Sequence, residues 1–209
     1  MSGTINLCEL VLVENVFPEC SIKMLDSLFH SDEFPWYYCK SIGLNEHSII
    51  RSPKHKNSVP SSGFSHLFCY PDTDNKLKIN SNYWDLIYEM VRVASDKLGV
   101  DPKKLVRCKA NLSTPQPSYP EGSFSSPHID LQREHTVALI YLNNSDGDTV
   151  IFEEQHKFPD GKEPETVTIR ETIPHKENTA LVFDGSIYHS AGLPINRTKR
   201  INLNLDFEV

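Results

Sequence analysis

Apolar residues recur at helical spacing between positions 80 and 99, and this is the clearest pattern in the first half of the chain. The repeating positions are Trp84, Ile87, Met90, Val91, Ala94 and Leu98. The pattern predicts a helix that begins after Asn80 or Ser81. Gly99 is expected to close this helix, because glycine tolerates the backbone conformation that commonly follows a last helical turn.

The segments before this helix predict a mixture of short elements. An apolar run over residues 8–14 predicts an opening strand, and a helix is expected from Ser21, as its N-cap, to about Phe29. Residues 45–63 are polar and predict a long loop. Residues 64–70 are rich in aromatic side chains and predict another strand.

After Pro102 the pattern changes to short apolar runs separated by turn clusters such as 145–148 and 159–161. The runs predict strands over residues 105–112, 128–131, 136–142, 149–153, 166–173, 179–184 and 199–207. So many short strands indicate a mainly β, α+β chain built around an antiparallel sandwich or barrel. The N-terminal helices would pack on one sheet and leave the other side open for a site.

Length and composition favour one globular unit. The chain has 209 residues, 38% hydrophobic and 23% charged, which is ordinary for a soluble domain. We expect a single domain, with residues 1–100 as a helical support and residues 101–209 as a β core. A net charge of −7 disfavours a general electrostatic grip on nucleic acid or on an anionic membrane surface.

The apolar runs and the cysteines indicate the cellular compartment of the protein. No apolar run approaches the roughly 18–20 residues that span a bilayer, and the first residues do not resemble a signal peptide. The five cysteines are odd in number and widely spaced, without a C-x-x-C motif. This argues against a disulfide framework and a thiolate zinc site. We therefore expect a reducing, cytoplasmic compartment.

The sharpest local signal is the motif His128-Ile129-Asp130. In a strand, residues i and i+2 point the same way, roughly 6.5–7 Å apart. His128 and Asp130 could then bind one ion. A set of imidazole and carboxylate ligands suits Fe(II) better than do the thiolate-rich ligand sets that are typical of structural zinc sites. A second histidine from elsewhere would complete a two-histidine, one-carboxylate set with open coordination positions.

The motif alone is weak evidence, because His30-Ser31-Asp32 and His175-Lys176-Glu177 have similar spacing. His30 follows a helical stretch, where i and i+2 lie about 200° apart. His175 lies near a proline in a polar turn. An isolated H-x-D motif is more often a pair of surface residues than part of a metal site.

The expected partner of the motif is His189, which follows the apolar strand 179–184 and a turn. A strand end can aim a side chain at an ion. Judged alone, His189 could equally be a buried histidine bonded to the backbone, and this alternative stays open at this point.

Strict alternation over residues 200–207 adds a cation to this set. Ile201 and every second residue after it face an apolar layer, so Arg200, Asn202, Asn204 and Asp206 face the other way. A guanidinium can bind a carboxylate through two parallel hydrogen bonds. The alternatives are a solvent-exposed polar face, or Arg197 in the preceding turn as the functional cation.

The order His128-x-Asp130, His189 and Arg200 resembles the 2-oxoglutarate/Fe(II) dioxygenase superfamily, particularly its prolyl-hydroxylase-like branch and the small phage and marine-microbial enzymes in it. Supporting segments are 119–124 (YPEGSF), 137–143 (VALIYLN) and 146–152 (DGDTVIF). The resemblance covers residues 105–207. Residues 1–100 match only as a helical support.

By this resemblance the fold is a double-stranded β-helix, a jelly-roll or cupin-like barrel. His128, Asp130 and His189 would bind iron, and Arg200 the distal carboxylate of 2-oxoglutarate. Tyr141 would donate a hydrogen bond to the same carboxylate, although it could instead be a core aromatic. Asn202 stands where related enzymes often have Ser or Thr. Animal collagen prolyl hydroxylases carry Lys at the position of Arg200, so the chain departs from that subgroup.

The resemblance implies Fe(II), 2-oxoglutarate and O₂, with ascorbate as a further candidate cofactor. The implied reaction hydroxylates an unactivated C–H bond while 2-oxoglutarate is converted to succinate and CO₂. The leading substrate is a peptidyl proline, in a peptide or protein. Free amino acids, other small molecules and damaged nucleobases would suit the same core, although the acidic charge weakens the nucleic-acid option.

Three features bear on substrate entry. Arg107, Lys109 and Asn111 alternate on one strand face, which is either a solvated face, the commoner case, or part of the mouth of the site. Loops 45–63, 113–125 and 154–165 are candidate lids.

Two other functional classes stay open. One is a cupin-like metalloenzyme that does not use 2-oxoglutarate and would have no use for Arg200, and the other is a catalytically silent β-barrel module.

Overall fold

A computed structural model describes residues 10–41, 53–196 and 198–209. Its helices are α1 (Glu19–Phe29), α2 (Trp84–Leu98) and the 3-10 turn η1 (Pro102–Lys104). Its strands are β1 (Val11–Glu14), β2 (Tyr37–Cys39), β3 (Gly63–Pro71), β4 (Leu77–Ile79), β5 (Leu105–Ser113), β6 (Thr136–Tyr141), β7 (Ser145–Gln155), β8 (Ile169–His175), β9 (Thr179–Asp184), β10 (Ile187–Ala191) and β11 (Arg200–Phe207).

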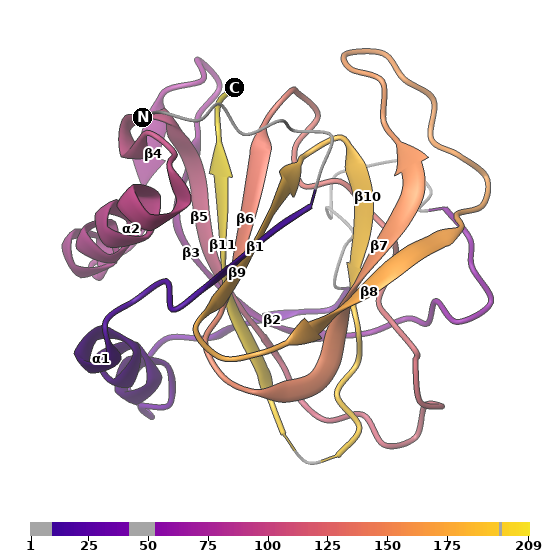
Figure 1. Cartoon of the computed structure of the whole chain (residues 1–209), viewed down its shortest axis with the longest axis horizontal. Helices are drawn as coiled ribbons and strands as arrows, with labels where there is room; N and C mark the ends of the chain where they lie inside the picture. The colour runs from indigo at the N-terminus through magenta and orange to yellow at the C-terminus, as the bar shows by residue number, and fades with distance from the viewer. Residues whose placement is uncertain (1–9, 42–52, 197) are drawn as a thin grey trace.

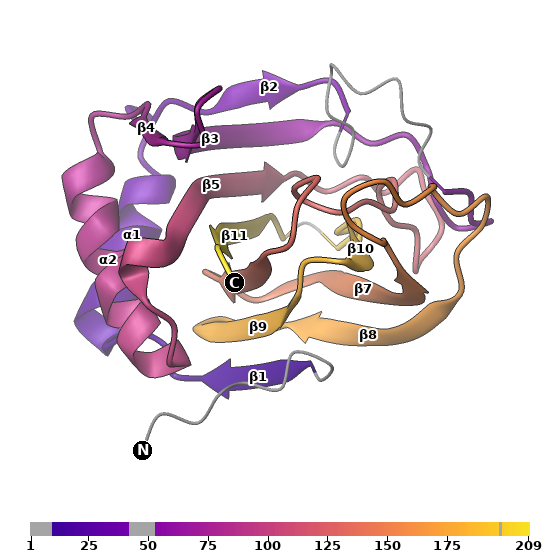
Figure 2. The ribbon, with the colours of Figure 1, turned by 90° about the horizontal axis from the view of Figure 1, so that it is seen from above.

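The strands form two sheets. The larger has the order β1-β9-β6-β11-β5-β3-β2, with β4 added beside β3, and the smaller has the order β10-β7-β8. Every strand pairing in both sheets is antiparallel. The helices lie at one side of the larger sheet, and the smaller sheet lies away from them (Figures 1 and 2). The fold is a double-stranded β-helix with supporting helices, as expected.

The alternation on β11 explains how the larger sheet separates two layers. Ile201, Leu203, Leu205 and Phe207 pack with residues of α1 and α2 in the main hydrophobic cluster. Arg200, Asn202, Asn204 and Asp206 are also buried, although they alternate with these apolar residues. The second face of β11 is therefore an internal polar surface rather than a solvated one. This surface carries the candidate site.

The helix boundaries are close to those expected, with one correction. Helix α2 ends at Leu98, and Gly99 follows with a φ of +69°, a left-handed conformation that suits glycine. Helix α1 begins at Glu19, directly after Pro18, so the prediction of Ser21 as its N-cap was wrong. Pro18 accounts for the earlier start, because its φ of −56° is already close to a helical value and its carbonyl accepts the Ser21 N–H.

Two strand predictions in the β core were wrong. Residues 128–131 form no strand; His128 makes only an isolated bridge to His189, with both backbone N–H···O distances at 3.0 Å. Conversely, strand β10 was not expected. It pairs with β7 in the smaller sheet, so His189 lies within a strand instead of just beyond one.

The predicted turn at residues 145–148 belongs to strand β7, and this was also wrong. Its polar residues make tertiary contacts: the Asp146 carboxylate accepts N–H groups of Ile195 and Asn196 at 3.0 and 2.8 Å. Glycine is needed at Gly147, because a Cβ atom there would lie 2.7 Å from the carbonyl oxygen of Gly192. The strand accommodates these contacts by a shift of register against β8.

Some expectations fall wholly or partly outside the described residues. The loop at 45–63 is one, since only its part from residue 53 is described, where Lys54 and Ser58 make isolated bridges to distant segments. The cysteines that the structure describes, Cys20, Cys39, Cys69 and Cys108, are all free thiols. In the described segments, no helix has the length and apolar character needed to cross a membrane.

Candidate metal centre and its cavity

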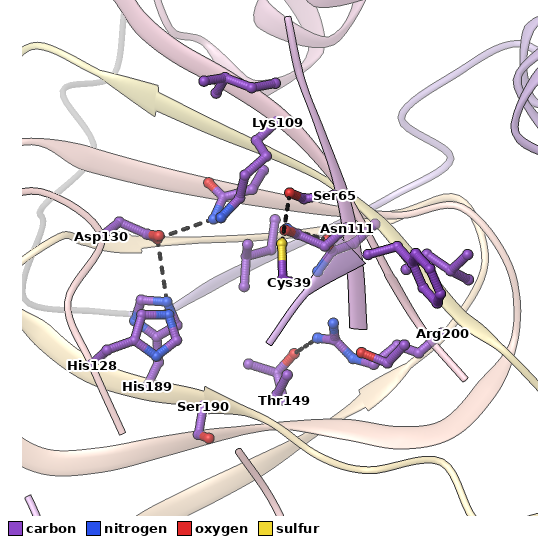
Figure 3. A pocket seen from close by; sticks show the side chains of 18 of the residues that line it. Cys39, Ser65, Lys109, Asn111, His128, Asp130, Thr149, His189, Ser190 and Arg200 are labelled. Carbon is purple, nitrogen blue, oxygen red and sulfur yellow. Dashed lines mark hydrogen bonds and ion pairs between the residues drawn. The ribbon is translucent and has the colours of Figure 1, made fainter. Parts of the chain in front are cut away.

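Three side chains that are far apart in the sequence converge on one point. His128 and Asp130 come from the segment before β6, and His189 comes from β10. Their ligand atoms all lie within 4.8 Å of one another, and among the described residues this is the one group of its kind. The imidazole rings of the two histidines lie side by side, with centroids 4.6 Å apart, and face Asp130 (Figure 3).

The hydrogen bonds of the two histidines prepare them as ligands. Nδ1 of His128 is 2.9 Å from the Ser126 carbonyl oxygen, and Nδ1 of His189 is 3.2 Å from the Ile187 carbonyl oxygen. A carbonyl oxygen can only accept, so Nδ1 carries the proton and Nε2 keeps its lone pair. Nε2 of His189 lies 3.3 Å from Asp130 Oδ2, so the free nitrogen faces the carboxylate.

Asp130 is held from two strands of the larger sheet. The Arg107 guanidinium on β5 donates to Asp130 Oδ1 and, at 3.3 Å, to the backbone carbonyl of the same residue. Asn204 on β11 donates to Asp130 Oδ2 at 3.1 Å. Asp206 accepts from Arg107 Nε at 2.5 Å, so one guanidinium joins two buried carboxylates. This arrangement fixes the orientation of the carboxylate that would bind a metal.

The electrostatics favour the protonation states that metal binding needs. Burial and the neighbouring His189 lower the pKa of His128 to about 3, so its imidazole is neutral. Burial alone would raise the pKa of Asp130, but Arg107 and His189 outweigh it and hold that pKa well below its usual value. The site therefore offers a neutral imidazole and a carboxylate at ordinary pH.

Arg200 is the first residue of strand β11, and it lines the same cavity as His128, Asp130 and His189. Its guanidinium donates to the Gly147 carbonyl at 2.8 Å and to Thr149 Oγ1 at 3.0 Å. The residue is only 3% exposed, and in the described chain no carboxylate lies within ion-pair distance of it. A buried cation without a counter-charge is costly, so this geometry favours an anionic ligand. Arg197, the competing cation, lies outside the described residues.

Two other expected residues lie near Arg200. The Tyr141 hydroxyl donates to Thr149 Oγ1 at 2.8 Å, and Tyr141 is fully buried behind that threonine instead of lining the cavity. Asn202 does line the cavity, and its Oδ1 accepts from Asn111 at 2.9 Å. Thr149 was not expected; its only signal in the sequence was its place in the segment 146–152.

The cavity has a volume of about 710 Å³ and is lined on one side by strand β5. Arg107, Lys109 and Asn111 all line it, so of the two possibilities for this strand face the structure shows the one that faces the cavity. Leu67 of β3 and Tyr38 of β2, two further strands of the larger sheet, also line it. Asn204 and Asp206 were expected to share the face of Arg200, but their contacts with Asp130 and Arg107 were not foreseen.

The other two H-x-acid motifs form no such cluster. His30 follows the last turn of α1 and bonds back to Asp26 on the surface. His175 was expected in a polar turn but is buried at the end of β8, with Nε2 3.2 Å from the Ile201 carbonyl oxygen. Its ring packs on Tyr141 at a centroid distance of 4.3 Å. Neither histidine joins the group at His128.

Comparison with known proteins rests on structure alone. No protein-family model and no curated protein matches the chain. Among solved structures, an oxidoreductase of the 2OG-Fe(II) oxygenase family from Burkholderia pseudomallei superposes with a TM-score of 0.64 at 12% identity, covering 99% of this chain and 88% of that one.

The chain has the fold of the 2-oxoglutarate/Fe(II) oxygenases. Two further structures with this oxygenase fold are similar. The epimerase SnoN from nogalamycin biosynthesis has a TM-score of 0.58 at 12% identity, covering 95% of this chain and 77% of that one. A prolyl-4-hydroxylase from Pseudomonas putida has a TM-score of 0.52 at 15% identity, covering 96% and 92%. An oxygenase fold is thus common to proteins that carry out different reactions.

Proposed function

We propose that this chain is a 2-oxoglutarate- and Fe(II)-dependent oxygenase that hydroxylates an unactivated C–H bond. The observation that carries the proposal is the pairing of His128, Asp130 and His189 with Arg200 in one cavity. The triad supplies a metal site, and the buried guanidinium supplies a site for a carboxylate. The oxygenase fold agrees with this assignment.

The residues present suit Fe(II). Two imidazoles and one carboxylate form the facial donor set that non-haem iron oxygenases use, and it leaves coordination positions open. His128 and His189 would bind through Nε2, since their Nδ1 atoms bond to backbone carbonyls. Arg107 and Asn204 would keep Asp130 in place while one of its oxygens binds the metal.

The opposite end of the cavity suits the distal carboxylate of 2-oxoglutarate. Arg200 would bind it, Thr149 Oγ1 lies beside the guanidinium, and Tyr141 orients that threonine. When bound, iron and 2-oxoglutarate supply the oxidation, in which O₂, the 2-oxo acid and R–H give succinate, CO₂ and R–OH. The protein's part is to hold both groups in one water-poor cavity and to orient the C–H bond.

Two alternative classes explain less of the site. A cupin-like metalloenzyme would use the three ligands but would leave the buried guanidinium of Arg200 without a purpose. A silent binding module would need neither the free Nε2 atoms nor the fixed carboxylate of Asp130. Ascorbate, which the family resemblance suggested, stays an expectation, since no described residue argues for it.

The decisive experiment is to add Fe(II) and 2-oxoglutarate to the protein without oxygen and record the visible spectrum. A weak charge-transfer band of the chelate is expected. Arg200→Ala should weaken 2-oxoglutarate binding by about tenfold or more, because a charge-assisted, bidentate pair is lost. Arg92→Ala, which changes an exposed arginine of α2, is the matched control and should leave the titration unchanged.

A cupin-like enzyme or a silent module would give no such band. If the band formed equally well in Arg200→Ala, the metal site would stand but the assignment of the cosubstrate site would be lost. Admission of O₂ should then produce succinate in the native protein and none in His189→Ala.

For the substrate, we propose a proline residue as the first candidate, on the family resemblance and on the similarity to a structure named as a prolyl-4-hydroxylase. The similarity to an epimerase means that the fold itself does not select this substrate. Incubation with proline-containing peptides, 2-oxoglutarate and O₂ should add one oxygen atom to the peptide, detected by mass spectrometry. Succinate formation that no proline compound stimulates would count against this choice.

A further inference from the structure

Lys109 is a cation of the cavity that makes no ion pair with any described residue. Its side chain extends from β5 into the cavity toward Asp130 (Figure 3). It makes no ion pair and no hydrogen bond with the described residues, whereas Arg107 on the same strand face is bonded to Asp130 and Asp206. Arg200 is bonded to Gly147 and Thr149.

The register of the sheet places Lys109 at the metal end of the cavity. Lys109 is paired with Asn204 on β11, and Asn204 contacts the ligand Asp130. Arg200 is four residues away along β11, about 13 Å at roughly 3.3 Å per residue. The distal 2-oxoglutarate carboxylate bound at Arg200 would therefore lie about four residues along the sheet from the position of Lys109.

Lys109 also lies on the side of the cavity that strands β2 and β3 line. On β3 its register partner is Leu67, and Tyr38, Phe64 and Leu67 give this part of the lining an apolar and aromatic character. Ser65 lies among them, bonded to the Cys39 thiol at 3.1 Å. A substrate that entered between these strands and the metal centre would meet apolar surface and one ammonium group.

The charge balance of the lining favours an anion. The cavity is lined by the cations Arg107, Lys109 and Arg200 and by the carboxylate of Asp130, and the Asp206 carboxylate also bonds to Arg107. This local excess occurs in a chain whose net charge is −7. Lys109 is half-buried and has no ion-pair partner among the described residues, so a negative ligand would improve the charge balance at its ammonium group.

We propose that Lys109 binds the carboxylate of the substrate, and that the substrate is a small organic acid with an apolar body. This inference rests on the proposed function. One ammonium group balances one carboxylate, and the distance from Arg200 leaves that cation to 2-oxoglutarate. Among the proline compounds proposed as substrates, free proline and peptides that end in proline satisfy this requirement.

The test compares acids with the neutral amides of the same skeleton. L-proline and L-prolinamide, hexanoate and hexanamide, and phenylacetate and phenylacetamide are titrated calorimetrically, without oxygen, into protein saturated with Fe(II) and 2-oxoglutarate. At least one acid should bind about tenfold or more tightly than its amide, as expected for a hydrogen bond to a charged group. Lys109→Met should remove this preference and Lys109→Arg should keep part of it.

Lys103→Met is the matched control, because it removes an exposed lysine just before the same strand, and it should bind the acids as the native protein does. The inference is overturned if no acid binds better than its amide, or if Lys109→Met keeps the preference. It is also overturned if Lys109→Met weakens 2-oxoglutarate binding, since Lys109 would then serve the cosubstrate. A normal charge-transfer band in the native protein shows that such a failure is not a failure of the proposed function.

Discussion

At the scale of single residues, the candidate centre depends on a guanidinium that holds a metal ligand in place and is not itself a ligand. Arg107 lies between two buried carboxylates and donates to both, so it neutralises charge that burial would otherwise make unfavourable. Its contact with the backbone carbonyl of Asp130 fixes the main chain as well as the side chain. Arg107 is therefore a positioning residue for the metal ligand.

We predict that Arg107→Ala lowers metal affinity about 10- to 100-fold, as loss of an outer-shell partner does elsewhere. Mn(II) binding measured by electron paramagnetic resonance is the direct readout, with Arg92→Ala as the control for an exposed arginine. Because loss of one partner from a buried ion pair also costs stability, Asp206→Asn provides a milder second variant. Native Mn(II) affinity in a folded Arg107→Ala protein would show that Asp130 needs no such support.

The sequence predicted the residues of the site better than it predicted their supports. His128, Asp130, His189 and Arg200 were chosen from spacing and alternation, and the structure brings the first three together with Arg200 in the same cavity. The bond between Arg107 and Asp206 joins residues 99 positions apart. A local pattern contains no information about such a pair, because only the register between β5 and β11 brings the two together.

At the scale of elements, strand β11 has two functions that its alternation separates. One face packs on the helices, and the other carries Arg200 and Asn204 into the cavity. The same alternation made β11 predictable. The start of β7 was not predicted, because Asp146 and Gly147 have turn-forming character that here serves contacts with Ile195 and Gly192. Tertiary contacts overrode the local preference.

We predict that Leu203→Ala lowers the free energy of unfolding by about 2–5 kcal/mol, because it leaves a cavity in the core beneath β11. Leu77→Ala, at a leucine that is 42% exposed on β4, should change it by no more than about 0.5 kcal/mol. Urea denaturation of the two variants measures both. Equal effects would mean that the layer between β11 and the helices is not the main source of stability.

At the scale of the whole molecule, the candidate centre joins the two sheets. His189 belongs to β10 of the smaller sheet, whereas Asp130 is held by Arg107 and Asn204 of the larger one. Among the described residues, the hydrophobic cluster that packs the helices includes strands of the larger sheet and no residue of the smaller sheet, which lies away from the helices (Figure 2). A metal bound by all three ligands would therefore add a link between sheets that no packed helix supplies.

This arrangement predicts that metal stabilises the folded protein as a whole. Mn(II) at about 100 times its dissociation constant should add about 2.7 kcal/mol of stability. For a chain of this length that corresponds to a rise in melting temperature of roughly 5–10 °C, measurable by differential scanning fluorimetry. Addition of 2-oxoglutarate should raise the temperature further, because it binds the folded state alone.

Two variants separate the contributions of metal and cosubstrate. His189→Ala removes the ligand that the smaller sheet provides, so it should lose most of the rise with Mn(II). Arg200→Ala should keep that rise and lose most of the increment from 2-oxoglutarate, because Arg200 would bind the distal carboxylate of the cosubstrate and is not among the metal ligands. A rise of the same size in His189→Ala would mean that the ion binds elsewhere, and the link between the two sheets would then have to come from packing alone.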